Sequence, residues 1–252
     1  MQGLWGEYAQ PAFWIGVGQI IWINILLSGD NAVVIALACR TLMPRQRFWG
    51  MILGAGVAVL LRVVFTGIIA QIMAFPFLKL VGGLLLFWIA VKLIVPEESH
   101  GDGKIQAADN LWRAVRIIAI ADIVMSLDNV IAIAGAADTA SAKLAAEHAA
   151  AIKWTLISFG LATSIPLIIA GSALLMALLD RYPIFVWAGA GLLGWIAGEI
   201  IITDAAVAGW LGSEIVHIYE LWAAAAGAAF VVGLGYLLVL RRRALAGGES
   251  EL

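Results

Sequence analysis

The sequence contains a single cysteine, Cys39, and this scarcity excludes an internal disulfide and any cysteine cluster for metal. Charged residues are also scarce: they make up 13% of the chain, whereas hydrophobic residues make up 63% and the mean hydropathy is +1.00. Soluble domains usually contain about 25% charged and about 45–50% apolar residues. The shortage of charge therefore excludes an ordinary soluble domain and indicates a polytopic membrane protein.

The apolar runs are long enough to cross a bilayer, which takes about 20 residues of helix. They lie at residues 12–39, 48–73, 76–95, 114–137, 152–179, 183–203 and 221–240. The sequence therefore predicts an all-α fold with seven transmembrane helices. Residues 1–10 contain no basic residue, and the first apolar run is longer than a signal-peptide core. We expect that first helix to be retained in the mature protein.

Basic residues are concentrated in alternate connections between these predicted spans. One set of connections contains Arg40, Arg45, Arg47, Lys104, Arg113, Arg116, Arg181, Arg241, Arg242 and Arg243. The other set contains only Lys79, Lys143 and Lys153. Because basic connections stay in the cytoplasm, the pattern predicts a multi-pass protein of the plasma or inner membrane. Its N-terminus should lie outside and its C-terminus in the cytoplasm.

Two pairs of segments repeat within the chain. Residues 25–36 and 123–134 are identical at six of twelve aligned positions, and residues 79–94 and 186–201 are identical at seven of sixteen. Coincidence does not explain two such matches in the same order. The chain therefore contains an internal duplication.

The duplication divides the chain into a first repeat at 12–95, a cytoplasmic linker at 96–110 and a second repeat at 111–204. Each repeat contains three predicted spans. Because three is odd, the second repeat must enter the membrane the opposite way up. This is the inverted-repeat plan of many secondary transporters, whose substrate site lies near the midplane. The seventh helix, 221–240, stands outside the repeats.

Each repeat places an Asp-Asn pair inside an apolar run: Asp30-Asn31 in the first and Asp128-Asn129 in the second. An ionised aspartate at the centre of an inserted helix costs at least about 2.5 kcal/mol. The pairs could merely connect helices by hydrogen bonds, although asparagine or serine alone would do so more cheaply. We interpret the two aspartates as a pair of carboxylates that balance one divalent cation.

Other oxygen-bearing side chains share a helix face with each asparagine, at spacings of three and four residues. The predicted metal ligands are Asp30, Asn31, Asp128, Asn129, Asn24, Ser28, Asp122 and Ser126. Carboxylate, amide and hydroxyl oxygens suit manganese, magnesium or calcium, and the spans offer no histidine or cysteine cluster for softer metals. The sequence therefore predicts a site for a hard divalent cation.

The backbone at these motifs has two alternatives. In an unbroken helix Asp30 points about 100° away from Asn31, so each aspartate would then serve a different face. Alternatively the helix opens near Ser28-Gly29 and frees carbonyl groups as further ligands. Gly29 favours opening in the first repeat, whereas Leu127 at the matching position does not.

The motifs SGDN and SLDN, together with Arg62 in LLRVVFTG and the run GGLLLFWIAVKLI, resemble the TerC family of integral membrane proteins over about residues 12–240. The resemblance implies export of manganese, with Asp30, Asn31, Asp128 and Asn129 as the functional core. The ligand types alone do not distinguish manganese from calcium. The outward direction of transport also rests on the resemblance.

Polar residues outside the motifs have separate interpretations. Arg62 lies near the middle of the second span, and we interpret it as a counter-ion for the carboxylates when no metal is bound; a structural helix tie is the alternative. Lys92 should reach the membrane interface as an anchor. The stretch EIVHIYE, with Glu214, His217 and Glu220, should form a solvated loop, although these three side chains could also collect metal. The arginines at 241–243 should anchor topology.

These observations predict a transporter that works by alternating access, not an enzyme, with the metal ion as substrate and no cofactor. Its other contacts would be membrane lipid and not nucleic acid, and a homo-oligomer is left open. One alternative is an intramembrane aspartyl protease, because two membrane-embedded aspartates could share a proton and activate water. The Gly-x-Gly-Asp pattern of such proteases is absent. Another alternative is a non-transporting scaffold for stress responses.

Overall fold

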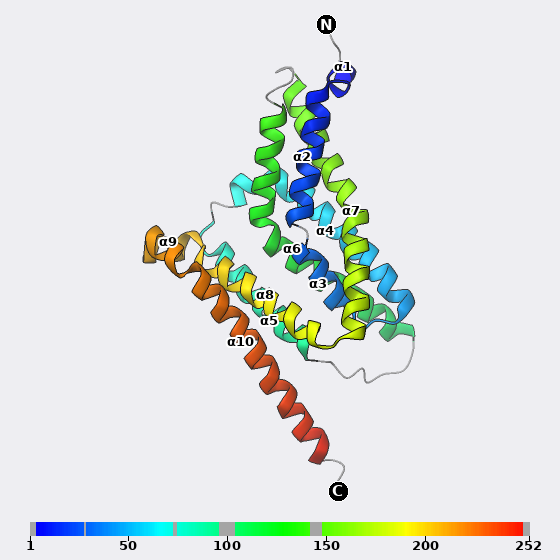
Figure 1. The fold of residues 1–252 in the computed structure, drawn as a ribbon, viewed down its shortest axis with the longest axis vertical. Coiled ribbons are helices and arrows are strands. Elements are labelled where there is room, and N and C mark those ends of the chain that lie inside the picture. The colour runs from blue at the N-terminus through cyan, green and yellow to red at the C-terminus, as the bar shows by residue number, and fades with distance from the viewer. Residues whose placement is uncertain (1–3, 28, 73–74, 96–103, 142–147, 249–252) are drawn as a thin grey trace.

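The computed structural model describes residues 4–27, 29–72, 75–95, 104–141 and 148–248. Within these ranges all regular secondary structure is helical, as the long apolar runs predict (Figure 1). The helices are α1 (Leu4–Tyr8), α2 (Pro11–Leu27), α3 (Gly29–Cys39), α4 (Pro44–Ile72), α5 (Leu78–Ile94), α6 (Lys104–Ser141), α7 (Ala149–Arg181), α8 (Ile184–Ile202), α9 (Ala205–Leu211) and α10 (Ser213–Gly248).

Several helices are long and apolar enough to cross a membrane. Four do so as single stretches: Pro44–Ile68, Ala150–Arg181, Ile184–Ile202 and Glu214–Arg242. Two bent pairs raise the number to as many as six if each pair is one span. The multi-pass, all-helical architecture is confirmed. The count of seven stays a prediction, because α5 has only 17 residues, at the short end of the range for a transmembrane helix, about 17–25.

Both bends fall at the Asp-Asn motifs. The axes of α2 and α3 differ by 51° across the break after Leu27. Within α6, the stretch Ala108–Ser126 is bent by 61° from Asn129–Ser141. The second repeat is therefore bent at its motif as well as the first, although α6 continues through it and the second motif has Leu127 where the first has Gly29.

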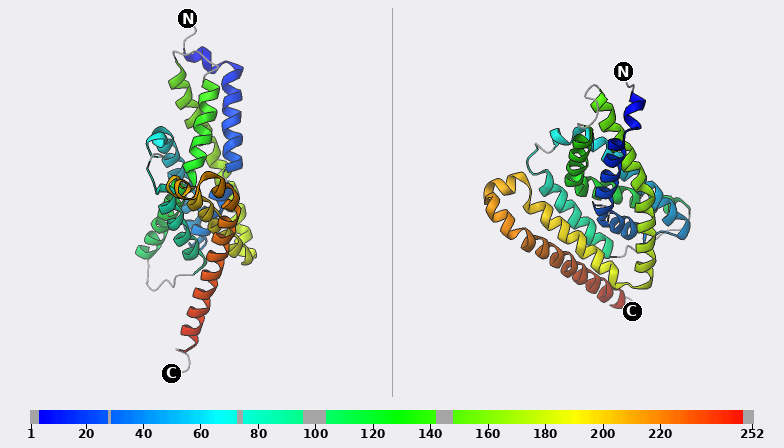
Figure 2. Two further views of the ribbon diagram at one scale, coloured as in Figure 1. Left: turned by 90° about the vertical axis from the view of Figure 1, so that its left-hand side faces the viewer. Right: turned by 45° about the horizontal axis from the view of Figure 1, so that its top comes forward.

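The helices pack as two neighbouring groups (Figures 1 and 2). In one group α4 packs along α6, and α7 packs along both α2 and α3. In the other group α8 lies between α5 and α10. The hydrophobic core extends through both groups, and it includes Ile35 of α3, Ile118 and Ile133 of α6, and Leu193 of α8. The motifs lie in the first group.

Small residues bring α8 and α10 into close contact. A Cβ atom on Gly194 would lie 2.6 Å from the carbonyl oxygen of Gly227, and one on Gly198 would collide with the backbone of Ala223. Glycines four residues apart allow two helix backbones to approach in this way in membranes. Helix α10 is therefore attached to the bundle through backbone contact as well as side-chain packing.

The outer helices are apolar on their exposed faces. Only 24% of the spanning window of α7 and 22% of that of α10 are buried, compared with 44% for α8. Large exposed apolar side chains include Leu174, Trp222 and Leu237. Such a surface suits lipid and not water, since soluble monomers rarely expose large continuous apolar patches.

Two sequence-based boundaries differ from the structure. The predicted linker 96–110 includes the beginning of α6, which starts at Lys104; residues 96–103 lie outside the described part of the chain. The EIVHIYE stretch, predicted as a loop, forms the first turns of α10 instead. There His217 and Glu220 are one turn apart, and the histidine is 91% exposed. The charged side chains of this stretch favoured a loop in the sequence analysis. A helix that extends beyond the apolar run exposes the same side chains to solvent equally well.

Candidate functional site

The first Asp-Asn pair lies at the break between α2 and α3. Asp30 is in the first turn of α3, and its Oδ1 accepts a hydrogen bond from the backbone N–H of Asn31 at 2.7 Å. The first N–H groups of a helix have no acceptor within that helix, and their partial positive charge stabilises a nearby carboxylate. The break therefore supplies local stabilisation for an anionic side chain within the predicted first span.

The two motifs meet at one backbone carbonyl. The oxygen of Leu27, the last residue of α2, accepts a hydrogen bond from Nδ2 of Asn31 at 3.3 Å. It also accepts one from Nδ2 of Asn129 at 3.4 Å, although Asn129 is 102 residues further along the chain. Both asparagines are buried. The structure thus brings together the asparagines of the two motifs, whereas the predicted meeting of Asp30 and Asp128 stays a prediction.

Arg62 of α4 forms a buried ion pair with the second repeat. Its Nη2 donates to Oδ1 of Asp122 at 2.6 Å and to Oγ of Ser126 at 2.9 Å, and its Nε donates to the same Oγ at 3.2 Å. The exposed fractions of the Arg62 and Asp122 side chains are 1% and 3%. Arg62 therefore has a specific carboxylate partner, which is Asp122.

Part of this ion pair has no partner. Among the buried side-chain atoms that the structure describes, Nη1 of Arg62 and Oδ2 of Asp122 form no hydrogen bond. Asp30 lies within electrostatic range of both groups. A buried charge with unsatisfied atoms is costly unless another group completes it. The ion pair therefore keeps polar atoms available beside the motifs.

Some predicted ligands cannot be placed. Ser28 lies outside the described residues, and so do the side chains of Asn24 and Asp128. Of the predicted ligands that are described, Asn31 and Asn129 converge on Leu27, and Asp122 and Ser126 bind Arg62. The metal-ligand set as a whole stays a prediction.

Conventional metal ligands do not cluster in the described part of the chain. There, no group of three or more histidine, cysteine, aspartate or glutamate side chains could hold a metal ion. Cys39 is buried within the hydrophobic core. The motifs bring together one carboxylate, two amide groups and one backbone carbonyl. Each of these groups has an oxygen atom of the kind that hard cations bind.

Sequence reasoning missed two groups at this site. It considered free carbonyls in general but did not identify the Leu27 oxygen, because only the position of the break determines which carbonyl is released. It also passed over Thr66, a buried residue whose Oγ1 donates to the carbonyl of Arg62 at 2.7 Å. The four-residue spacing from Arg62 was the available signal, since a helical threonine commonly donates to the carbonyl four residues earlier.

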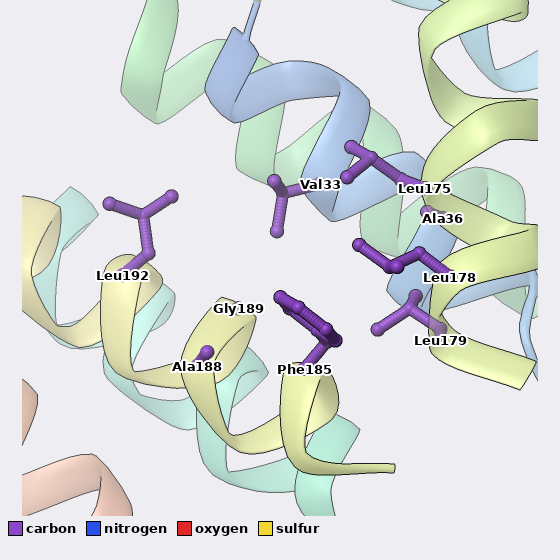
Figure 3. A pocket seen from close by; sticks show the side chains of 9 residues that line it. All are labelled: Val33, Ala36, Leu175, Leu178, Leu179, Phe185, Ala188, Gly189 and Leu192. Atoms are coloured by element: carbon purple, nitrogen blue, oxygen red, sulfur yellow. The ribbon is translucent and has the colours of Figure 1, made fainter. Parts of the chain in front are cut away.

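An apolar groove adjoins the first motif on α3 (Figure 3). Its volume is about 190 Å³, and its walls come from α3, α7 and α8. Figure 3 shows Val33 and Ala36 of α3 facing Phe185 and Gly189 of α8 across this space. No side chain that lines it carries a polar group. The groove therefore cannot bind a cation, but it leaves open space beside the half-helix that begins at the motif.

Comparison with known proteins identifies relatives over most of the chain. The sequence profile of the Integral membrane protein TerC family matches residues 9–244. "Uncharacterized membrane protein YjbE" of Bacillus subtilis (strain 168) is 40% identical over 185 residues, which are 73% of this chain and 78% of that protein. "Uncharacterized membrane protein YceF" of the same strain is 28% identical over 138 residues, 51% of this chain and 54% of that protein.

A more distant relative is "UPF0053 inner membrane protein YoaE" of Escherichia coli (strain K12). It is 29% identical over 143 residues, which cover 50% of this chain and 28% of that protein. No solved structure matches the chain. The match over residues 9–244 and the similarity to YjbE agree with the resemblance carried by the two motifs. The chain therefore belongs to the TerC family of integral membrane proteins.

Proposed function

We propose that this protein transports a hard divalent cation across the membrane through a site that both Asp-Asn motifs form. The observation that carries the proposal is the convergence of Asn31 and Asn129 on the carbonyl oxygen of Leu27. Each asparagine that donates through its nitrogen keeps its amide oxygen for a cation. Helix breaks of this kind provide free carbonyls and helix ends near the midplane of many transporters.

Charge balance supports a divalent cargo. Arg62 neutralises Asp122, so the third carboxylate near the motifs is already paired. Asp30 and Asp128 then remain to balance two positive charges, and we propose that both bind the same ion. In this arrangement Arg62 is a counter-ion for Asp122 alone. The sequence by itself indicates a counter-ion for the carboxylates in general. Asp122 and Ser126 would become metal ligands only if Arg62 moved away.

The packing of the helices supports an inverted repeat. Helix α4 of the first repeat packs on α6 of the second, and α7 of the second packs on α2 and α3 of the first. The matching helices α5 and α8 pack against each other. Bends occur at the same motif in both repeats. We therefore keep the plan of seven spans, with three in each repeat and α10 as the seventh.

The ligand chemistry restricts the cargo to a class and not to one metal. Amide, carboxylate and carbonyl oxygens favour manganese, magnesium and calcium over softer metals. We propose manganese, and transport out of the cytoplasm, because the family resemblance implies both. The alternating-access step would move the half-helix α3, which borders the apolar groove. An exporter of this kind needs no cofactor and is not an enzyme.

The ion pair between Arg47 and Asp180 supports the proposed orientation. The two side chains meet at 2.5 Å and connect the beginning of α4 to the end of α7. Both helix ends lie beside arginines that the positive-inside rule assigns to the cytoplasm. The N-terminus would then be outside and the C-terminus in the cytoplasm of the inner or plasma membrane.

A transport assay with purified full-length protein in liposomes tests the proposal. A fluorescent indicator of divalent metal inside the liposomes should report manganese entry above the level in protein-free liposomes, and added calcium or magnesium should compete. Runs with and without a pH gradient would distinguish proton antiport from uniport. Cleavage of membrane-embedded peptides without metal flux would favour the protease. The absence of both activities in correctly inserted protein would favour the scaffold.

A further inference from the structure

A second polar feature lies between the C-terminal parts of α5 and α10, on helices that carry none of the predicted metal ligands. A cavity of about 500 Å³ opens there. The residues that line it are Trp88, Val91, Lys92, Val95, Leu238, Arg241 and Arg242. We refer to this set as the α5–α10 pocket.

The polar wall of the α5–α10 pocket is entirely basic. Lys92, Arg241 and Arg242 supply three positive charges, and no carboxylate is among the described residues that line the pocket. The Nζ atom of Lys92 lies 4.7 Å from the centre of the Trp88 ring, within the range of a cation–π contact. Ammonium and guanidinium groups donate charge-assisted hydrogen bonds to phosphate oxygens, so an anionic phosphate that lies among these three side chains would be stabilised.

The remaining wall is apolar, and the two helices touch beside it. Val91, Val95 and Leu238 contribute hydrocarbon, and the indole of Trp88 is 54% exposed. A Cβ atom on Gly235 would lie 2.7 Å from Cδ1 of Ile94, which lies between the lining residues Lys92 and Val95. A molecule with an anionic head and an apolar body matches these two walls. A small inorganic anion would use only the basic wall.

The positions of the basic residues at the helix ends fit the depth of lipid headgroups. Lys92 is in the last turn of α5, and Arg241 and Arg242 end the spanning stretch Glu214–Arg242. The positive-inside pattern assigns these helix ends to the cytoplasmic leaflet. Tryptophan is typical of this interfacial layer. Basic pockets between helices on the cytoplasmic side bind the headgroups of anionic lipids.

We propose that the α5–α10 pocket binds one anionic phospholipid. The phosphate lies between Lys92, Arg241 and Arg242, and an acyl chain runs along Trp88 and Leu238. Such a lipid adds to the direct contact between α5 and α10, which is less extensive than the contact of either helix with α8. This proposal does not depend on which ion the protein transports.

Native mass spectrometry of the detergent-solubilised full chain tests this site. Phosphatidylglycerol should bind in preference to phosphatidylcholine. Each of the variants Lys92→Gln, Arg241→Gln and Arg242→Gln should weaken phosphatidylglycerol binding about fivefold, the worth of one basic residue near a membrane surface. The triple variant should lose the preference. A matched control replaces Arg45, Arg116 and Arg181, three exposed arginines outside the pocket, by glutamine, and it should retain the preference.

Three outcomes would overturn the proposal. Equal binding of phosphatidylglycerol and phosphatidylcholine by the wild type would exclude recognition of the anionic headgroup. An equal loss in the control triple variant would indicate general surface charge and no particular pocket. Glycerol phosphate that displaces phosphatidylglycerol at equal concentration would indicate a site for a free phosphate compound. Circular dichroism of each variant would verify that its helices are intact before binding is compared.

Discussion

Arg62 has the largest side chain among those that are almost completely buried in the described part of the chain, and its charge has one carboxylate partner, Asp122. Arg62→Leu should lower the free energy of unfolding by about 3–5 kcal/mol, because it leaves the Asp122 charge buried alone. The double variant Arg62→Leu with Asp122→Leu should recover most of this loss. Thermal unfolding in detergent measures both effects.

Arg62→Lys is the matched control, because it keeps the positive charge but removes the guanidinium group. It keeps one positive charge but cannot donate to Asp122 and Ser126 in the same fork geometry, so its stability should fall between those of the wild type and the leucine variant. If the losses of Arg62→Leu and Asp122→Leu simply added in the double variant, the two residues would not act as a pair.

The Arg62–Asp122 contact also shows where sequence reasoning ended. The depth of Arg62 in its span predicted a buried counter-ion, and the duplicated motifs predicted that the two halves share a site. The partner could not be predicted, because the two residues are 60 positions apart and on different helices. Periodicity relates residues within one helix, whereas this contact depends on how α4 packs on α6.

Asp204 connects two elements, since it caps α9 and also binds the beginning of α5. Its Oδ1 accepts from the N–H of Ala206 at 2.9 Å, and its Oδ2 accepts from that of Leu80 at 3.1 Å. Burial raises the pKa of Asp204, but backbone N–H groups, first that of Leu80 and then that of Ala206, outweigh it and hold the pKa below its usual value. The folded protein therefore favours the charged carboxylate.

A lowered pKa means that Asp204 stabilises the fold fully above the ordinary aspartate pKa, about 3.9, and that this contribution is lost as the pH falls from there through the lower pKa of the folded protein. Asp204→Ala should cost about 1 kcal/mol at pH 6, the usual worth of a helix cap. Asp204→Asn, which keeps one acceptor oxygen, should cost less. Thermal unfolding at pH 6 and pH 3 measures the difference. A difference that is the same at both pH values would contradict the role of the charge.

The contact between α8 and α10 depends on the absence of a side chain at Gly198. Gly198→Leu should push the helices apart, because the new Cβ atom would collide with the backbone of Ala223. Overpacking of this kind costs about 1–3 kcal/mol. Gly233→Leu is the matched control, since nothing lies within 4 Å of a Cβ atom there. Thermal unfolding should separate the two variants, and equal stabilities would contradict close backbone contact at Gly198.

The bends in the helices were only partly predictable. Gly29 favoured a break in the first motif, and α3 does begin at that residue. The second motif carries Leu127, a good helix former, yet α6 bends there by 61°. Local propensity therefore does not determine the second bend. Tertiary packing commonly overrides local propensity in this way.

For the molecule as a whole, the inverted repeat requires the two polar connections to lie on opposite sides of the membrane. A reporter inserted after Gly103 should be cytoplasmic, and one inserted between Asp138 and His148 should be external, as the distribution of basic residues predicts. Fusions to an enzyme active on only one side measure this. If both reporters were on the same side, α6 would not cross the membrane and the inverted repeat would be wrong.

Composition predicted the all-helical membrane fold because a bilayer requires every backbone polar group to be satisfied within the chain. The number of spans is less certain from sequence, since hydropathy does not distinguish a straight helix such as α8 from a bent pair such as α2 and α3. The side-by-side packing of α5 and α8 was also not predictable, although their sequences match at seven of sixteen positions.

Metal flux by aspartate variants tests most directly the claim that both motifs serve one cation. Asp30→Asn and Asp128→Asn each keep the size of the side chain and one oxygen ligand but remove a charge. Each alone should abolish most manganese transport in liposomes, and the double variant should be scarcely worse, because both residues act on the same ion.

Ser126→Ala is the control in the same assay, because it removes no charge but only a neutral hydroxyl that accepts from Arg62, so it should weaken transport far less. Circular dichroism should verify that the helices of every variant are intact. Near-zero flux in both single variants, with no further loss in the double variant, is the predicted result. Wild-type manganese flux in both single variants, with normal insertion, would contradict the shared site.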